Sequence, residues 1–159
     1  MYVQSMSEDS PSYKILNGEN LTVGIIAARF NESYVDALIE SASATLTAHN
    51  TLTPAIYRVP GSNELPYAAE RLASSSDRYD ALIALGVVLA GATHHHLTIA
   101  DSTATALHQI AIKHRIPVIN GIIVVESEAQ AEERCSGSIN RGREFALAAL
   151  EMALFQTNL

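Results

Sequence analysis

Four apolar runs of strand length are spaced along this chain. They are residues Val23–Ala28, Ala55–Val59, Ala81–Leu89 and Val118–Val125. Each run is nearly continuous rather than alternating with polar residues, which is typical of strands that are covered on both faces. We therefore expect four strands in the middle of a layered α/β protein, with helices on both sides of the sheet.

Helical patterns fill the spaces between the four runs. Apolar residues return every three or four positions after each of the first three runs, which predicts one amphipathic helix in each gap. We also expect a short helix at residues 127–134 and a last helix at about residues 143–155. The three apolar faces are formed by Val35, Leu38, Ile39, Ala42 and Leu46, by Leu65, Ala68, Ala69 and Leu72, and by Ile99, Ala100, Leu107, Ile110 and Ala111.

The alternation of strands and helices predicts right-handed crossovers and a four-stranded parallel sheet. The 159 residues suit one domain with one core, in which residues 1–13 form a polar, flexible N-terminal segment. Ligands of such folds bind at the carboxyl ends of the strands. Candidate chemistry is therefore sought in the loops that follow the four runs.

The low content of charged residues predicts buried surface between subunits. Charged residues make up 17% of the chain, below the usual quarter of a soluble protein. Residues 145–150 are apolar on all sides of their helix, so they are covered either by the chain's own core or by another subunit. We favour coverage by a neighbouring subunit.

Charge and cysteine usage narrow the class of protein further. The net charge of −7, without a Lys/Arg cluster, argues against nucleic acid as a partner. No charge-free stretch reaches the length of a membrane span. The single cysteine, Cys135, cannot form a disulfide within the chain, and the polar N-terminus lacks a signal-peptide pattern. We therefore expect a cytoplasmic protein.

The first loop at the expected ligand edge carries an aromatic residue. Phe30 either stacks on a planar heterocycle or packs against its own loop. Asn31 or Ser33 is expected to cap the helix that follows. The loop after the second run makes a turn at Pro60 and Gly61, and its free backbone N–H groups suit carbonyl or hydroxyl ligands.

Two charged residues near strand ends each allow two interpretations of their role. Glu64 either accepts hydrogen bonds from a ligand or compensates the dipole of its helix. Arg134, after the fourth run, either clamps a phosphate or pairs with a nearby glutamate. The chain has only two lysines, Lys14 and Lys113, and neither follows a run directly, so an enzyme-bound Schiff base is not expected.

The loop after the third run combines a candidate phosphate site with histidines. Gly91 allows close approach of a ligand, and the N–H groups around Ala92 and Thr93, with the Thr93 hydroxyl, suit a single phosphate. His94, His95 and His96 follow at once. Consecutive helical residues point about 100° apart, so the three are not expected to bind one metal ion. One histidine acting as acid or base beside a phosphate is the better functional reading.

In this order, these segments resemble the lumazine synthase family. The resemblance runs from about Thr22 to Leu154, and the ordered set is far more specific than any one stretch. The matching stretches are Arg29-Phe30-Asn31, Val59-Pro60-Gly61-Ser62-Asn63-Glu64-Leu65-Pro66, Gly91-Ala92-Thr93-His94-His95, Ile116-Pro117-Val118, Glu126 through Gln130 to Glu133-Arg134, and Asn140-Arg141-Gly142 leading to Ala149-Leu150-Glu151-Met152.

The resemblance implies a flavodoxin-like three-layer α/β/α fold, with room for an extra N-terminal strand. It implies a cofactor-free condensation of 5-amino-6-(D-ribitylamino)uracil with 3,4-dihydroxy-2-butanone 4-phosphate. The products would be 6,7-dimethyl-8-ribityllumazine and phosphate, in riboflavin biosynthesis. It also implies a homo-oligomer, a pentamer or a multiple of five, in which two subunits share each active site.

The resemblance also assigns roles to single residues. His95 falls on the acid/base histidine, and Arg141, which replaces a lysine of the family, is a further candidate. Asn120 would close the pocket from an adjacent subunit. The phosphate would be held by Ala92, Thr93 and Arg134. The pyrimidine and its ribityl chain would be held by Phe30, Ser62, Asn63, Glu64, Val87, Val88 and Leu89 together with Asn120.

Departures from the family pattern leave other functions open. Ala90 stands where an arginine is usual, and Asn63 stands where an aromatic or apolar residue is common. The alternatives are a non-catalytic paralogue that binds a lumazine or flavin, a shell-forming protein, and an unrelated phosphate-binding domain of the same fold. Turnover of both substrates separates the enzyme from the paralogue, particle size alongside turnover identifies a shell-forming protein, and an unrelated domain would have no affinity for ribityl-pyrimidines.

Overall fold

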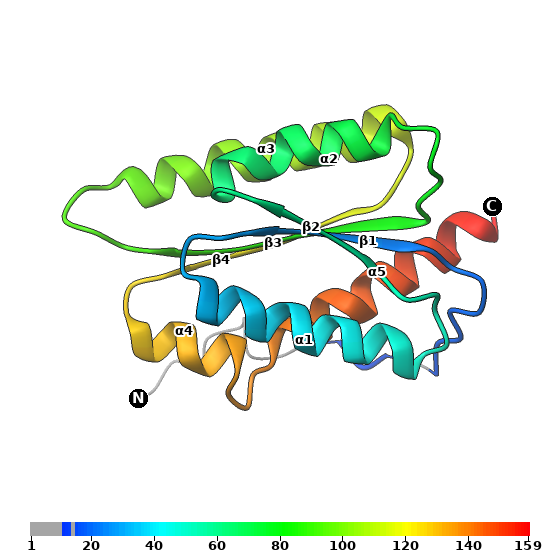
Figure 1. Ribbon diagram of the computed structural model, residues 1–159, viewed down its shortest axis with the longest axis horizontal. Helices are drawn as coiled ribbons and strands as arrows, with labels where there is room; N and C mark the ends of the chain where they lie inside the picture. The colour runs from blue at the N-terminus through cyan, green and yellow to red at the C-terminus, as the bar shows by residue number, and fades with distance from the viewer. Residues whose placement is uncertain (1–10, 14) are drawn as a thin grey trace.

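The computed structural model describes residues 11–13 and 15–159, and it centres on a four-stranded parallel sheet with the order β2-β1-β3-β4 (Figure 1). All four strands have the predicted bounds. They are β1 (Val23–Ala28), β2 (Ala55–Val59), β3 (Ala81–Leu89) and β4 (Val118–Val125). The helices are α1 (Glu32–Ala48), the short 3-10 helix η2 (Ser62–Glu64), α2 (Leu65–Ala73), α3 (His95–His114), α4 (Glu128–Cys135) and α5 (Arg141–Thr157).

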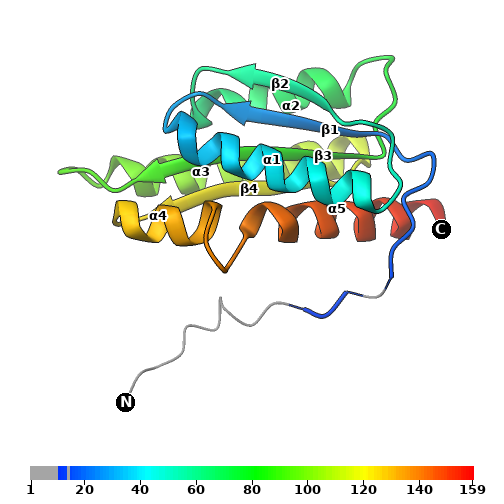
Figure 2. The same ribbon diagram turned by 60° about the horizontal axis from the view of Figure 1, so that its bottom comes forward.

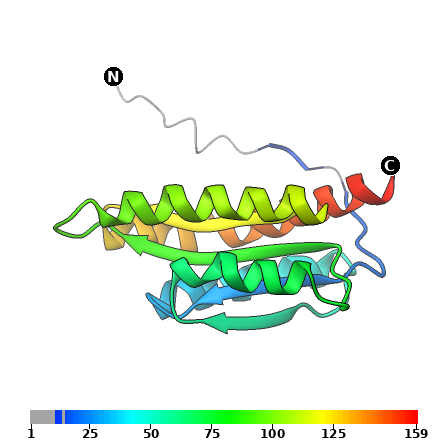
Figure 3. The same ribbon diagram turned by 90° about the horizontal axis from the view of Figure 1, so that it is seen from above.

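The helices form two layers that sandwich the sheet, so the predicted three-layer fold is confirmed. Helices α2 and α3 lie on one face, and α1, α4 and α5 lie on the other (Figures 1 and 3). Residues 11–13 and 15–22 add no strand to the sheet, so the extra N-terminal strand is absent from the described part of the chain. The rest of the segment 1–13, expected to be flexible, lies outside the described residues.

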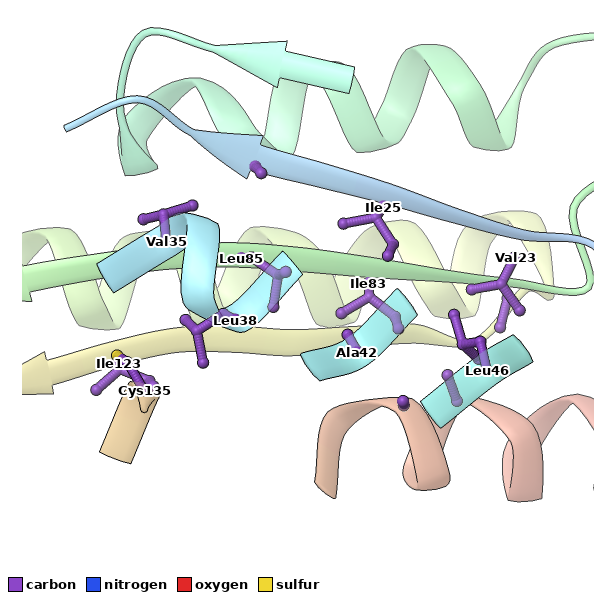
Figure 4. Packing of buried hydrophobic residues seen from close by; sticks show 14 of the residues in the cluster. Val23, Ile25, Val35, Leu38, Ala42, Leu46, Ile83, Leu85, Ile123 and Cys135 are labelled. Carbon is purple, nitrogen blue, oxygen red and sulfur yellow. The ribbon is translucent and has the colours of Figure 1, made fainter. Parts of the chain in front are cut away.

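Burial on both faces explains why the central strands are continuously apolar. On β1, Ile25 points toward α1, whereas the next residue, Ile26, belongs to the cluster under α2 and α3. Figure 4 shows Ile25 beside Ile83 of β3 on the α1 side of the sheet. Every residue of β1 is buried, but the edge strand β2 alternates between half-buried and exposed positions. Within the described residues, no helix is both long and apolar enough to cross a membrane.

The last helix is buried in the chain's own core, which corrects the expectation that a neighbouring subunit covers residues 145–150. Ala146, Leu147, Ala149 and Leu150 are all at most 2% exposed in this single chain. Helices α5 and α1 lie side by side on the same face of the sheet (Figures 1 and 2). The apolar residues of this segment are therefore covered by α1 and the sheet. They are not evidence for association with another subunit.

Two residues near the start of α5 explain its position. Asn140 adopts a left-handed conformation with φ of 48°, and its Oδ1 accepts a hydrogen bond from the Arg143 N–H at 3.2 Å. This cap starts the helix at Arg141, two residues before the expected position. Gly142 then faces α1 so closely that a Cβ atom would lie 2.7 Å from the Leu38 carbonyl oxygen.

The thiol of Cys135 is expected to be unreactive in the folded protein. Cys135 is buried at the end of α4 (Figure 4), and burial, followed by the Glu132 carboxylate, raises the pKa of the thiol to about 11. The reactive thiolate is then a minor species at pH 8. We expect a thiol reagent such as DTNB to label the native protein slowly and to label one thiol at once in denaturant. Rapid labelling of the native protein would contradict this.

Candidate active site

A cavity of about 460 Å³ opens where the carboxyl ends of β1, β2 and β3 meet, which is the edge expected to bind ligand. Its volume is in the range of small-molecule sites. It contains His95 and every predicted pyrimidine- or ribityl-binding residue except Asn120. The lining residues are Phe30, Asn31, Gly61, Ser62, Asn63, Glu64, Val87, Val88, Leu89, His95 and Ile99.

Phe30 stands at the rim of the cavity on the loop between β1 and α1. Its side chain is 73% exposed, so the loop's own packing does not use most of the ring. The backbone N–H groups of Arg29 and Phe30 donate to carbonyls at the end of β2, with 3.2 Å from Phe30 N to Pro60 O. A Cβ atom at Gly61 would lie 3.1 Å from the ring. The backbone thus presents an open aromatic face beside the cavity, suited to stacking.

Glu64 bonds to its own turn and also lines the cavity, and its role in binding a ligand stays a prediction. Its Oε2 accepts a hydrogen bond from the Gly61 N–H at 2.8 Å, across the η2 turn. This bond satisfies a free donor at the helix start and orients the carboxylate. The other oxygen, Oε1, remains able to accept from a ligand. Beside it, Ser62 is buried and Asn63 is exposed.

Ser62 occupies space that only a glycine in β3 leaves free. A Cβ atom at Gly86 would overlap the Ser62 Oγ atom and would lie 3.3 Å from Leu65 Cδ1. Gly86 is fully enclosed within the strand, so it cannot move away. The position of the η2 turn against the sheet therefore depends on the missing side chain at Gly86.

Replacing Gly86 with alanine is expected to displace Ser62 and to widen the η2 turn. Overpacking of this kind costs about 1–3 kcal/mol of unfolding free energy. We expect a lower thermal midpoint and weaker pyrimidine binding. A Ser62→Ala background tests the cause, because removing Oγ should reduce the penalty of Gly86→Ala. A penalty of equal size in both backgrounds would mean that another contact is responsible.

His95 is the histidine of the run of three that lines the cavity. It is the first residue of α3, and Ile99 lies one turn further along the same wall. His94 precedes the helix, and the Nδ1 atom of His96 lies 3.2 Å from the Thr93 carbonyl oxygen. Within the described residues, no group of three or more potential ligand side chains could hold a metal ion. Of the three histidines, only His95 lines the cavity, and its acid/base role stays a prediction.

The predicted phosphate loop lies outside the cavity. The loop between β3 and α3 projects beyond the neighbouring strand ends (Figures 1 and 3), and its residues Gly91, Ala92 and Thr93 are exposed. Gly91 does not have a positive φ, and a Cβ atom there would meet nothing within 4 Å. Neither the backbone conformation nor the neighbours of Gly91 among the described residues require a glycine at this position.

Three of the predicted site residues do not line the cavity of this chain. They are Asn120, Arg134 and Arg141. Asn120 lies in β4, and its Oδ1 accepts from the Ile122 N–H at 3.1 Å. Arg134 is in the last turn of α4, 3.5 Å from the Gln130 carbonyl oxygen, with no ion pair among residues 11–13 and 15–159. The expected pairing of Arg134 with a glutamate is thus not present. Arg141 forms an ion pair with Glu144.

Asn31 contributes to the site in a way that the sequence did not indicate. It adopts a left-handed conformation with φ of 56° and makes no side-chain cap to α1. Instead, its Nδ2 donates to the Val87 carbonyl oxygen at 2.7 Å, across to the end of β3. Asparagine tolerates this conformation better than most residues, which was the available signal. The partner, 56 residues away, depends on the fold.

The fold and the cavity define a flavodoxin-like α/β protein with a candidate small-molecule site at the carboxyl ends of its strands. Residues 20–157 match the 6,7-dimethyl-8-ribityllumazine synthase family, and the chain belongs to this family. Individual proteins that carry the family's name are also similar to this chain. The 6,7-dimethyl-8-ribityllumazine synthase of Thermococcus kodakarensis is 38% identical over 136 residues, which cover 86% of each chain.

Relatives from bacteria give similar coverage. The protein of the same name from Polaromonas sp. is 40% identical over 140 residues, which cover 87% of this chain and 88% of the relative. The protein of the same name from Leptothrix cholodnii is 38% identical over 146 residues, which cover 91% of this chain and 92% of the relative. The similarity therefore extends over nearly the whole of each protein and includes all the strand ends that form the cavity.

Proposed function

We propose that this protein condenses 5-amino-6-(D-ribitylamino)uracil with 3,4-dihydroxy-2-butanone 4-phosphate to 6,7-dimethyl-8-ribityllumazine, releasing phosphate, in riboflavin biosynthesis. The observation that carries the proposal is that one cavity unites an open aromatic ring, a carboxylate and a histidine. Phe30, Glu64 and His95 come from three different strand ends. Membership of the family and the names of its relatives support the same reaction.

The lining of the cavity matches the pyrimidine substrate. The ring of Phe30 stacks on the uracil, and the carboxylate oxygen Oε1 of Glu64 accepts a hydrogen bond from the ring or from the ribityl chain. Ser62 and Asn63 add a hydroxyl and an amide for the ribityl hydroxyls. The apolar end of β3, formed by Val87, Val88 and Leu89, also lines the cavity.

The reaction needs proton transfers but no protein nucleophile. The 5-amino nitrogen of the uracil attacks the ketone carbon, and loss of water forms an imine. Loss of the proton from C3 then expels phosphate from C4, and the resulting enol becomes a ketone. The ribitylamino nitrogen attacks this ketone, and loss of a second water closes the ring. His95 moves protons in these steps, and much of the acceleration comes from holding both substrates together.

The site is proposed to be completed by a neighbouring subunit in a homo-oligomer, a pentamer or a multiple of five. None of the residues that line the cavity is lysine or arginine, although the butanone substrate carries a phosphate. Arg134 of the next subunit would supply the cation, beside Ala92 and Thr93, and Asn120 would close the pyrimidine pocket. Arg141 is a further candidate. The single buried thiol suits a cytoplasmic protein.

A turnover assay tests the proposal directly. The purified protein, with both substrates and no added metal or cofactor, is expected to form the fluorescent lumazine and one phosphate per turnover. Activity that a chelator abolishes and a divalent metal restores would contradict the cofactor-free reaction. Tight binding of the lumazine without any turnover would favour the non-catalytic paralogue.

A further inference from the structure

The loop that carries Phe30 is short, and the ring itself does little to hold it in place. Residues 29–31 join β1 to α1, and the Phe30 side chain is 73% exposed. An aromatic ring stacks on a ligand only while its loop stays in one position. The contacts that fix the ends of this loop therefore decide how often the ring is ready to bind.

Arg58 of β2 holds both ends of the loop at once. Its Nη2 donates to the carbonyl oxygen of Ala28, the last residue of β1, at 3.3 Å. The same guanidinium lies 2.6 Å from Asp36 Oδ1 and 3.7 Å from Glu32 Oε1, in the first two turns of α1. One side chain thus connects the residue before the loop with the helix after it.

A second contact holds the loop from the opposite side. The Asn31 amide donates to the Val87 carbonyl oxygen of β3, whereas Arg58 acts from β2. These two strands flank β1 in the sheet. The loop is thus held from both neighbouring strands, and the backbone hydrogen bonds of Arg29 and Phe30 to the end of β2 remain when either side-chain contact is lost, so such a loss is expected to loosen the loop rather than to release it.

We propose that Arg58 is a positioning residue, which fixes the loop 29–31 so that Phe30 is ready to stack on the pyrimidine. The inference rests on the proposed function for the identity of the ligand. Exposed ion pairs usually contribute little to stability. Arg58 differs because its planar guanidinium reaches the Ala28 backbone carbonyl as well as the Asp36 and Glu32 carboxylates, although both carboxylates are exposed. It does not line the cavity, so it acts through the loop.

Substituting Arg58 should affect one substrate more than the other. Apparent affinity falls with the fraction of molecules in the binding-competent state. We expect Arg58→Ala to raise KM for the pyrimidine roughly 5- to 10-fold, and to change KM for the butanone phosphate and kcat less than about 2-fold. Arg58→Lys keeps a positive charge beside Asp36 but loses the planar guanidinium. Its KM for the pyrimidine should therefore lie between that of the unchanged protein and that of Arg58→Ala. Arg71→Ala, at the exposed end of α2, is the matched control.

A fluorescent reporter separates positioning from general destabilisation. The chain has no tryptophan, so Phe30→Trp places a single indole at the loop. We expect acrylamide to quench this indole more strongly in the Arg58→Ala background than with Arg58 intact, at temperatures well below unfolding. The Arg71→Ala background should leave the quenching unchanged.

The outcomes decide the inference in either direction. Unchanged quenching, or an equal rise in both KM values, would overturn the positioning role. Should Arg58→Ala fail to fold, Arg58→Lys and Asp36→Asn still test it, because each removes part of the same contact set. Should the protein turn over neither substrate, the proposed function fails, but the quenching difference still reports whether Arg58 holds the loop.

Discussion

Replacing His95 with alanine is expected to lower kcat about 100-fold, the usual contribution of a general acid–base group. His95 begins α3 and lines the cavity together with Phe30 and Glu64. The side chain is exposed in this chain, so truncation removes no buried contact and the fold should persist. The uracil amino group remains the nucleophile, and therefore the loss should be smaller than for an enzyme that loses a covalent nucleophile.

The neighbouring histidines provide matched controls for this measurement. His94→Ala and His96→Ala remove the same side chain at positions that do not line the cavity. We expect both to retain most of kcat, with pre-steady-state and steady-state rates measured on the same substrate pair. A larger loss for His94→Ala than for His95→Ala would show that the wrong histidine has been assigned.

Replacing Arg134 with alanine is expected to raise KM for the butanone phosphate about 10- to 100-fold, which corresponds to the charge-assisted hydrogen bonds that a guanidinium makes to a phosphate. KM for the pyrimidine should change little. Arg134 has no ion pair within the described residues and does not line this chain's cavity, so its guanidinium is available to a neighbouring subunit. Equal losses for both substrates would contradict the phosphate assignment.

Mixing two inactive variants tests whether the site is shared between subunits. Arg134→Ala and His95→Ala proteins are unfolded together and refolded into mixed oligomers. Some junctions then contain an intact His95 from one subunit and an intact Arg134 from the next, so activity should exceed that of either variant alone. Each variant refolded by itself is the control. Mixed oligomers without recovered activity would mean that each site lies within one subunit.

Two of the corrections concern elements whose sequence left a choice between partners. The apolar residues 145–150 required a cover, but an apolar pattern does not say whether the cover belongs to the same chain. In the structure α1 and the sheet supply it. Likewise Asn31 was a plausible helix cap, yet its amide bonds to Val87, which only the fold brings within reach.

The sequence by itself determined the four strands and the edge of the sheet where the cavity opens. A central parallel strand buried on both faces requires a nearly unbroken apolar run, which marked β1 and β3, and the edge strand β2 has its predicted bounds although it is only partly buried. The turn residues after those runs then placed Phe30, Ser62, Asn63, Glu64 and His95 at one edge. Their assignment as ligand-binding and catalytic residues stays a prediction until the variants are measured.

Tertiary structure decided which way side chains point and which residues far apart in the chain come into contact. The family resemblance singled out His95 among three adjacent histidines, and the structure shows that His95, unlike His94 and His96, lines the cavity. Arg58 is an ordinary strand residue until the parallel register sets it beside β1 and its side chain reaches Asp36. Such contacts join residues far apart in the chain, so patterns within a short stretch of sequence do not predict them.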